Sequence, residues 1–192
     1  LLLINNAAIH GPVGPLEDTN IKLWKKVFNI NFFAHLKITK IILKVMLKNN
    51  NGSIINIAGG GSVSPRENFN AYSSSKTALI RFSENLSIEY SNEGINFNCI
   101  SPGILKSSLQ KEILKYYKKF VNKNELKKLK ITKKQNELNL NKLSNIISFL
   151  ISKDGKKISG KIISSKWDNL DYIKKNISKI KSSNYLTLRR II

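Results

Sequence analysis

Three short apolar runs divide the chain at intervals, and each predicts a buried β-strand. They cover residues 1–4, 53–58 and 95–100, and each ends in a loop of Asn, Ser or Gly residues. That combination is typical of a buried strand that runs into a turn. Stretches with helical periodicity separate the three runs. Strands that alternate with helices predict an α/β fold with a mainly parallel sheet and helices on both faces.

The helical stretches are recognised by apolar residues three or four positions apart. A start signal at residues 17–20 precedes the first stripe, and residues 48–52 are rich in Asn and end it. Asn31 is a polar residue on this apolar stripe, where an unpaired amide would cost about 1–3 kcal/mol. A second helix is predicted from residue 71 to about residue 90, and a third over residues 143–151. Residues 105–141 carry no strand signal.

The second of these helices begins with a Tyr and a Lys four residues apart, Tyr72 and Lys76. Residues at this spacing lie on the same face of a helix, one turn apart. The Lys76 ammonium is therefore expected to lie close to the Tyr72 ring and to lower the pKa of the phenol. Such a phenol can exchange a proton with a carbonyl or alcohol oxygen near neutral pH. The pair alone is a weak signal, because this spacing occurs by chance on many helices.

Charge is the most unusual feature of the composition, with a formal net charge of +21 over 192 residues. A polyanion-binding surface is one interpretation of this charge. Scattered lysines on solvated helix faces are the other. The cations are almost all Lys, with only Arg66, Arg81, Arg189 and Arg190 as arginines. Arginine is better suited to forked recognition of phosphates and bases. This composition favours solvated helix faces over nucleic-acid binding.

The remaining titratable residues offer little chemistry at the level of sequence. Cys99 is the single cysteine, so it cannot form an internal disulfide or contribute to a cysteine-based metal site. His10 and His35 show no metal-ligand spacing and are interpreted as ordinary polar residues. The chain has no long apolar run and no signal-peptide pattern, which predicts a cytoplasmic protein without membrane association.

With these segments in place, the chain resembles the short-chain dehydrogenase/reductase family. Residues 5–8 (Asn-Asn-Ala-Ala) are similar to the family's N-N-A-G segment, and Tyr72 and Lys76 match its Y-x-x-x-K pair. Trp24 and Asn31 match the helix that carries the family's active-site Asn. Residues 98–103 with Ser107 resemble its N-x-x-x-P-G-x-x-x-T segment, and residues 158–162 resemble its last strand. The order and spacing of five motifs are far more specific than any one of them.

The resemblance implies a Rossmann-like, doubly wound fold and an NAD(P)-dependent oxidoreductase that interconverts a carbonyl and a secondary alcohol. It assigns the general acid/base to Tyr72. Lys76 would lower the pKa of the phenol and hold the nicotinamide ribose, and Asn31 would position a water that relays protons. The residues expected to line the cofactor, NAD or NADP, are Asn5, Ala7, Ala8, Tyr72, Lys76, Pro102, Gly103 and Ser107.

Two departures from the family pattern stand out. The family places a Ser thirteen residues before its Tyr, and here that position is Gly59, preceded by Ala58. Ser62 and Ser64 are nearby hydroxyls that could replace it. The chain also begins inside what resembles the family's fourth strand. The first βαβαβ portion, with the Gly-rich turn that holds the cofactor pyrophosphate, is therefore expected to be missing. An incomplete chain is one explanation, and a truncated or decayed gene is the other.

By the same resemblance, residues 1–166 form the C-terminal part of one Rossmann-type domain, with a substrate lid at about residues 105–141. Residues 167–192 extend that domain. Trp167 and the terminal pair Arg189 and Arg190 would either close over the active site or contact a partner subunit. The Lys-rich lid is consistent with an anionic or sugar-linked substrate, but a solvated helix face is the favoured interpretation of these lysines. The family commonly dimerises through two helices, so a homo-oligomer is expected. A non-catalytic binding or scaffold protein that has lost the Ser is the alternative function.

Overall fold

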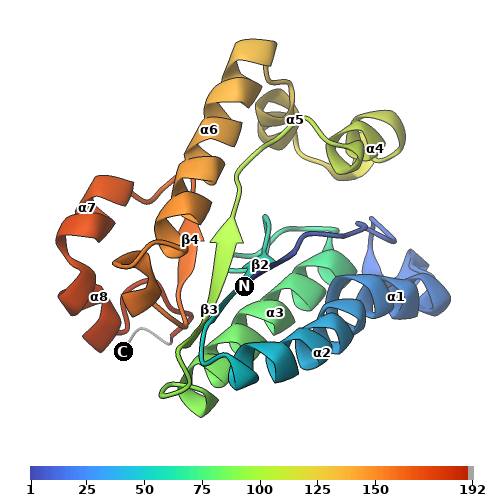
Figure 1. Ribbon diagram of the computed structural model, residues 1–192. Coiled ribbons are helices and arrows are strands. Elements are labelled where there is room, and N and C mark those ends of the chain that lie inside the picture. The colour runs from blue at the N-terminus through green and yellow to red at the C-terminus, as the bar shows by residue number, and fades with distance from the viewer. Residues whose placement is uncertain (190–192) are drawn as a thin grey trace.

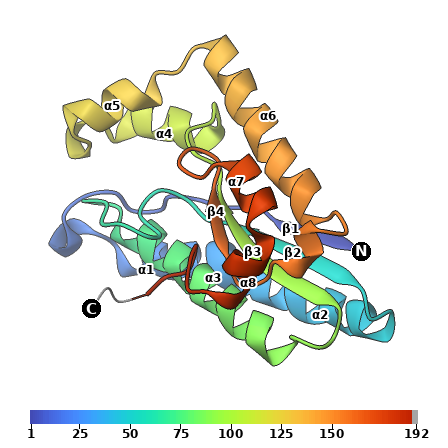
Figure 2. The ribbon, with the colours of Figure 1, turned by 90° about the vertical axis from the view of Figure 1, so that its left-hand side faces the viewer.

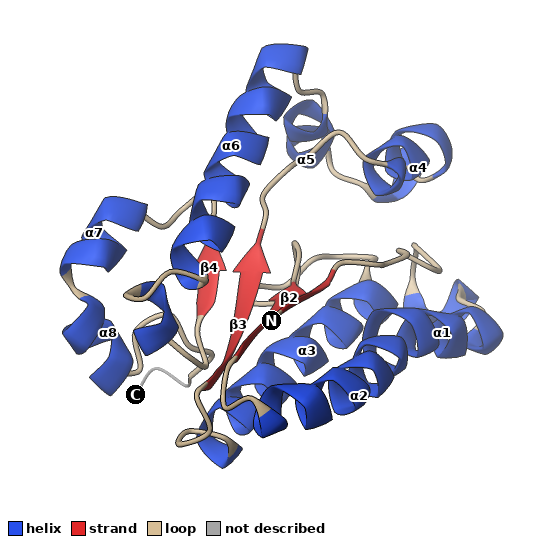
Figure 3. Cartoon of the chain, in the orientation of Figure 1, coloured by secondary structure: helices blue, strands red, loops and turns tan. Residues whose placement is uncertain are grey.

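A computed structural model describes residues 1–189 as one parallel sheet with helices on both faces (Figures 1 and 3). Its four strands lie in the order β1-β2-β3-β4, and every neighbouring pair is parallel. The strands are β1 (Leu2–Asn5), β2 (Gly52–Ile57), β3 (Ile95–Ser101) and β4 (Ile162–Ser164). The fold confirms the prediction of a Rossmann-like α/β architecture. Arg190 lies outside the described residues.

Two groups of helices cover the two faces of the sheet, and a third group lies beyond its carboxyl edge (Figure 1). On one face are α1 (Ile21–Phe28), α2 (Ala34–Lys48) and α3 (Asn70–Glu89), and on the other are α6 (Lys133–Leu150), α7 (Leu170–Lys175) and α8 (Ile177–Ser182). Beyond the edge are α4 (Ser108–Tyr116) and α5 (Lys123–Leu129). Short 3-10 turns cover Leu16–Asp18, Lys118–Phe120 and Gly155–Lys157. None of the helices within residues 1–189 is both long enough and apolar enough to cross a bilayer.

The core consists of two layers because successive residues of a strand point to opposite faces of the sheet. Toward α2 and α3, Ile54 and Phe97 pack with Met46. Toward α6, α7 and α8, Ile55 and Ile100 join a second cluster. The central strands are therefore buried on both faces, which explains why they read as continuous apolar runs. Residues of α7 and α8 belong to the second cluster, so the C-terminal extension packs against this sheet.

The first predicted stripe forms α1 and α2, joined by a π-helical turn at Asn29–Phe33. The Asn20 side chain accepts a hydrogen bond from Lys22 N and caps α1, as the start signal predicts. A π-turn inserts one extra residue into a helix and is frequent at functional sites. Here the π-turn carries Asn31, which is completely buried.

Two predicted boundaries were wrong. The last strand was expected at residues 158–162 but begins at Ile162, because Gly160 has a φ of +74° and interrupts the extended backbone before it. The helix expected at residues 143–151 begins ten residues earlier, at Lys133. Thr132 accepts a hydrogen bond from Gln135 N and caps that earlier start. The end of the expected lid region is therefore the first half of α6.

Candidate active site

The loops that follow the strands border a cleft of about 530 Å³ at the carboxyl edge of the sheet. Ligands of open α/β sheets bind at this edge, because parallel strands deliver their carboxyl-end loops to one place. Figure 2 shows α4 and α5 above the loops that follow β1 and β2. The cleft is lined by residues from all four loops, from α3 and from the lid, among them Asn6, Ala8, Tyr72, Lys76, Pro102, Gly103 and Ser107.

Tyr72 and Lys76 lie in the first turns of α3 and face the cleft. Both side chains are buried, with exposed fractions of 6% and 1%. The Lys76 ammonium donates a hydrogen bond of 2.7 Å to the backbone oxygen of Ile57, at the end of β2. Its Nζ lies 6.0 Å from the centre of the Tyr72 ring. The two residues therefore share one face of the helix, but the ammonium is bonded to the sheet.

The electrostatics of the pair differ from the sequence-based expectation. Burial raises the pKa of Tyr72 above its ordinary value, and the nearby charge of Arg66 only partly opposes it. Burial also lowers the pKa of Lys76 to about 8. The prediction that Lys76 lowers the pKa of the phenol was wrong for this structure, because loss of solvation outweighs the distant cation. Tyr72 is consequently a protonated phenol at neutral pH.

Gly59 is in direct contact with the Tyr72 hydroxyl. A Cβ atom built on Gly59 would lie 2.3 Å from Tyr72 Oη, far inside van der Waals contact. The phenol therefore occupies the space that a side chain at position 59 would need. Of the two hydroxyls considered as replacements, Ser62 is buried and donates a 2.7 Å hydrogen bond to the Gly59 oxygen. Ser64 lines the cleft, whereas Ser62 does not.

Asn31 and Asn5 do not line the cleft but organise the groups around it. The Asn31 amide nitrogen donates to Ile9 O and Ser75 Oγ at 3.0 Å, and its oxygen accepts from Ile9 N at 2.9 Å. Both amide hydrogens are thus occupied, which leaves neither for the expected relay water. Asn5 donates to Thr39 Oγ1 and Asn56 Oδ1 inside the core. Ala7, also expected at the cofactor, is likewise absent from the cleft wall.

The loop after β3 forms the opposite wall with Pro102, Gly103 and Ser107. Gly103 has a φ of +71°, a backbone conformation that favours glycine. The Ser107 side chain accepts a hydrogen bond from Gln110 N and caps α4. Its hydroxyl proton remains available to a ligand, so its capping role is compatible with the expected cofactor contact.

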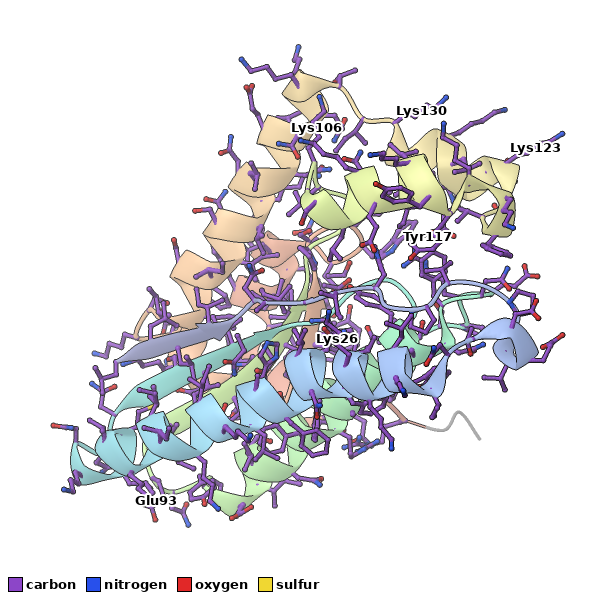
Figure 4. All side chains as sticks on the ribbon, turned by 90° about the vertical axis from the view of Figure 1, so that its right-hand side faces the viewer. Lys26, Glu93, Lys106, Tyr117, Lys123 and Lys130 are labelled. Atoms are coloured by element: carbon purple, nitrogen blue, oxygen red, sulfur yellow. The ribbon has the colours of Figure 1, made fainter. Side chains whose placement is uncertain are left out.

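Residues 104–129, which include most of the segment expected to be a substrate lid and are called the lid below, pack onto the loops that follow β1 and β2. Val13 and Phe69 join Ile113 and Val121 of the lid in one apolar cluster. Arg66 donates to Glu125 Oε1 through both Nε and Nη2, at 2.9 and 2.5 Å. An ion pair therefore connects the loop after β2 to α5. Figure 4 shows Lys123 and Lys130, at the two ends of α5, on the outside of the molecule.

Sequence reasoning missed several residues of the cleft, above all His10. It follows the Asn-Asn-Ala-Ala segment, is only 4% exposed, and its ring lies 4.9 Å from that of Tyr72. Burial, together with the charge of Arg66, lowers its pKa to about 3. The position of His10 in the loop that follows β1 was the one signal in the sequence. Trp167, 77% exposed, also borders the cleft.

The two buried histidines predict a loss of stability on acidification. Burial lowers the pKa of His35 to about 4, and Lys76 adds to the effect. The unfolded chain binds more protons than the folded protein between pH 6.5, the ordinary pKa of His, and the lowered pKa values of the two histidines. The free energy of unfolding therefore falls as pH falls through this range. At about pH 4.5 each histidine should contribute a loss of roughly 2–3 kcal/mol. Urea denaturation at pH 7 and pH 4.5 measures this loss. In the double variant His10→Phe, His35→Leu, most of the difference in the free energy of unfolding between the two pH values should disappear. An equal difference in that variant would contradict the prediction.

Comparisons with known proteins agree with this geometry. The model of the short chain dehydrogenase family matches residues 1–118. Dehydrogenase/reductase SDR family member 4 of Oryctolagus cuniculus is 32% identical over 164 residues, which are 84% of this chain and 60% of that protein. A mutant 4-hydroxyisoleucine dehydrogenase complexed with NADH and succinate has a TM-score of 0.68 at 26% identity, over 85% of this chain and 65% of the other. ElxO with NADP bound has a TM-score of 0.66 at 27% identity, over 85% of this chain and 64% of that chain.

The chain belongs to the short-chain dehydrogenase/reductase family. It spans about three fifths of the length of the curated relatives that it matches. The matched family model ends within the lid, after α4.

Proposed function

We propose that the protein is an NAD(P)-dependent oxidoreductase that interconverts a carbonyl compound and a secondary alcohol. The observation that carries this proposal is the Tyr72 hydroxyl at the cleft, on the same helix face as a buried Lys76. Relatives with NADH or NADP bound share the fold at about the same coverage. A protonated phenol in such a cleft is suited to donate its proton to a carbonyl oxygen.

The residues present fit the nicotinamide end of the cofactor. Lys76 uses one of its three N–H donors on Ile57 O, and two remain for ribose hydroxyls. Ala8, Pro102 and Gly103 leave the adjacent wall without bulky side chains. No Gly-rich pyrophosphate turn occurs in these residues, so the other end of the cofactor has no counterpart here. When bound, the cofactor supplies or accepts the hydride.

In this mechanism the chain's own residues orient the substrate and transfer the proton. Tyr72 Oη donates its proton to the carbonyl oxygen during reduction, and its phenolate form takes a proton from the hydroxyl during oxidation. Lys76 holds the ribose through the N–H donors that Ile57 O leaves free. Asn31 acts indirectly, because it fixes the loop after β1 through Ile9 and the catalytic helix through Ser75. Ser64 is the hydroxyl left to contact the substrate oxygen, since Ser62 is bonded to Gly59.

The substrate that this cleft favours is anionic. Arg66, Lys128 and Lys166 border the cleft, and within residues 1–189 its lining contains one acidic residue, Glu125, which Arg66 already binds. Surplus positive charge in a cleft raises the local concentration of an anionic ligand. This local excess supports an anionic substrate more directly than the lysines on the outer surface do.

A non-catalytic binding or scaffold protein is the second candidate. The observation that favours it is Gly59, because loss of one oxyanion donor can lower a rate about a hundredfold to a thousandfold. Such a protein would bind the cofactor without turnover.

The first experiment is a titration of the protein, expressed from its full gene, with NADH and NADPH, followed by energy transfer from tryptophan to the nicotinamide. Saturable binding is expected, and the preferred cofactor is then used with a panel of ketones and aldehydes. Binding without turnover on any carbonyl would support the scaffold candidate. A folded protein that binds neither cofactor would contradict both.

We also propose a homo-oligomer that associates through α2. Ile38, Ile41 and Val45 are 45%, 66% and 45% exposed on its outer face. An apolar stripe of this kind on a surface helix is typical of an interface. The variant Ile41→Glu should weaken association at least tenfold, which sedimentation velocity measures. Leu138→Glu, at a similarly exposed apolar position on α6 (47% exposed), is the matched control. If the Ile41→Glu variant sediments with the mass of the native oligomer, this face of α2 is not the interface.

A further inference from the structure

Arg66 is a half-buried cation that lines the cleft in a fixed orientation. Its side chain is 14% exposed, and its guanidinium carbon lies 3.5 Å from the centre of the Phe69 ring. Its Nε and Nη2 both donate to Glu125 Oε1. The guanidinium is therefore held against an aromatic ring and anchored along one edge, so it loses little conformational freedom when it binds a ligand.

The other end of the same guanidinium is free to bind a ligand. An arginine carries five N–H donors, and Glu125 occupies two of them. Nη1 has no hydrogen-bond partner within residues 1–189. A Cβ atom built on Gly60 would lie 4.0 Å from Nη1, and Gly60 lines the cleft. The unoccupied donors of Arg66 thus lie beside the glycine loop at the cleft.

The glycine loop also connects Arg66 with the group that is proposed to transfer the proton. Gly59 contacts Tyr72 Oη, and Gly60 is the next residue along the chain. These contacts place Tyr72 Oη and Arg66 Nη1 at most about 13 Å apart. Burial is the first cause of the raised pKa of Tyr72, and the charge of Arg66 opposes it, so the cation lies within electrostatic reach of the phenol. A substrate chain of a few carbon atoms spans this gap.

Positive charge and hydrogen-bond donors dominate the lining of the cleft. Within residues 1–189, it contains the cations of Arg66, Lys76, Lys128 and Lys166 but one carboxylate, that of Glu125. The Lys76 ammonium is bonded to a backbone oxygen and not to an anion. Buried cations are favourable when they pair with an anion that accepts their hydrogen bonds. A complementary ligand therefore brings negative charge and acceptor oxygens.

We propose that Arg66 is the specificity-determining residue of this site and that the free end of its guanidinium binds the carboxylate of a keto acid. The keto group then lies at Tyr72, and in the direction of oxidation the substrate is a hydroxy acid. A carboxylate is the matching group because its two oxygens accept a pair of parallel N–H donors. This inference rests on the proposed function and defines the substrate class of that same site.

The kinetic test compares keto acids with their methyl esters, which keep the carbon chain but lack the charge. Acetoacetate, levulinate and 5-oxohexanoate vary the spacing between the two groups. With the cofactor preferred in the titration, the native protein should reduce at least one acid with a kcat/KM at least about tenfold above that of its ester, the effect of one charge-assisted hydrogen bond. In Arg66→Gln the ratio of acid to ester should fall to about one. Arg66→Lys, which keeps the charge without the fork, should retain part of it.

The ratio separates substrate recognition from a structural role of Arg66. An arginine that only joined the loop to the lid would affect acid and ester equally, so an Arg66→Gln variant with the native ratio would overturn the inference. Arg81→Gln is the matched control, because Arg81 also pairs with a glutamate, Glu84, but is absent from the cleft lining. It should keep the native ratio. An equal fall of the ratio in Arg81→Gln would assign the preference to net charge and would also overturn the inference.

A second readout does not depend on turnover. Calorimetric titrations of Tyr72→Phe, with and without the cofactor, should show that the preferred keto acid binds at least about tenfold more tightly than its ester. The double variant Tyr72→Phe, Arg66→Gln should bind the two equally. If the native protein reduces none of these ketones but this difference in affinity is seen, the proposed function fails and the role of Arg66 stands. Equal turnover and equal affinity for acid and ester would overturn the inference and leave the proposed function intact.

Discussion

Replacing Tyr72 by Phe is expected to lower turnover by about 10²–10⁴-fold, because a positioned general acid contributes an effect of that size. The variant loses only the hydroxyl, whose space at Gly59 then becomes free. The ring keeps its contact with His10, so the fold and the affinity for the cofactor should be unchanged. Steady-state rates together with the nicotinamide titration measure the two effects separately.

Tyr116→Phe is the matched control for this experiment. It removes the same atom from a tyrosine of the lid that is 61% exposed, and it should leave turnover within about twofold of the native protein. Native turnover in Tyr72→Phe would end the proposed mechanism. An equal loss in Tyr116→Phe would show that the lid, and not the phenol at Gly59, limits the reaction.

The second large effect is expected from Gly59→Ser, which restores the residue that the family pattern places there. Its Cβ would lie 2.3 Å from Tyr72 Oη, so the phenol has to move toward the cleft. A displacement of about 1 Å at a reacting group can cost about a hundredfold in rate. We therefore expect turnover to fall by roughly that factor, although the variant gains a hydroxyl. Steady-state kinetics at saturating cofactor measure it.

Gly60→Ser provides the control, since a Cβ there would have its nearest neighbour, Arg66, at 3.9 Å. The same side chain one residue along the loop should therefore be tolerated. If Gly59→Ser instead raised the rate, the phenol would be free to adjust, and the missing Ser donor would be what limits the native protein.

Much of the fold could be predicted from the sequence because the evidence for it is local. Buried parallel strands form apolar runs in the sequence, and helices between the strands favour parallel pairing. Tyr72 and Lys76 share a helix face, since four residues make about one turn. The ends of individual strands and helices were harder to predict, because single residues set them. Gly160 shortened the last strand, and Thr132 moved the start of α6.

The tertiary structure decided how the residues of the site interact. It placed Lys76 on the oxygen of Ile57, and it left burial as the dominant influence on the pKa of Tyr72. Neither result could be inferred from helical spacing, which says nothing of the strand that ends beside the helix. The same holds for Asn31, whose partners lie 22 and 44 positions away in the sequence.

The sequence by itself therefore determined the architecture, the family and the Tyr–Lys pair, because each depends on residues within one element or on the order of elements. Only the tertiary structure brought His10 to Tyr72, filled the space beside Gly59 with the phenol, and joined Arg66 to Glu125 across the cleft. These contacts connect residues of different loops and helices. Their geometry follows from strand register and lid packing, and no local pattern of residues encodes either one.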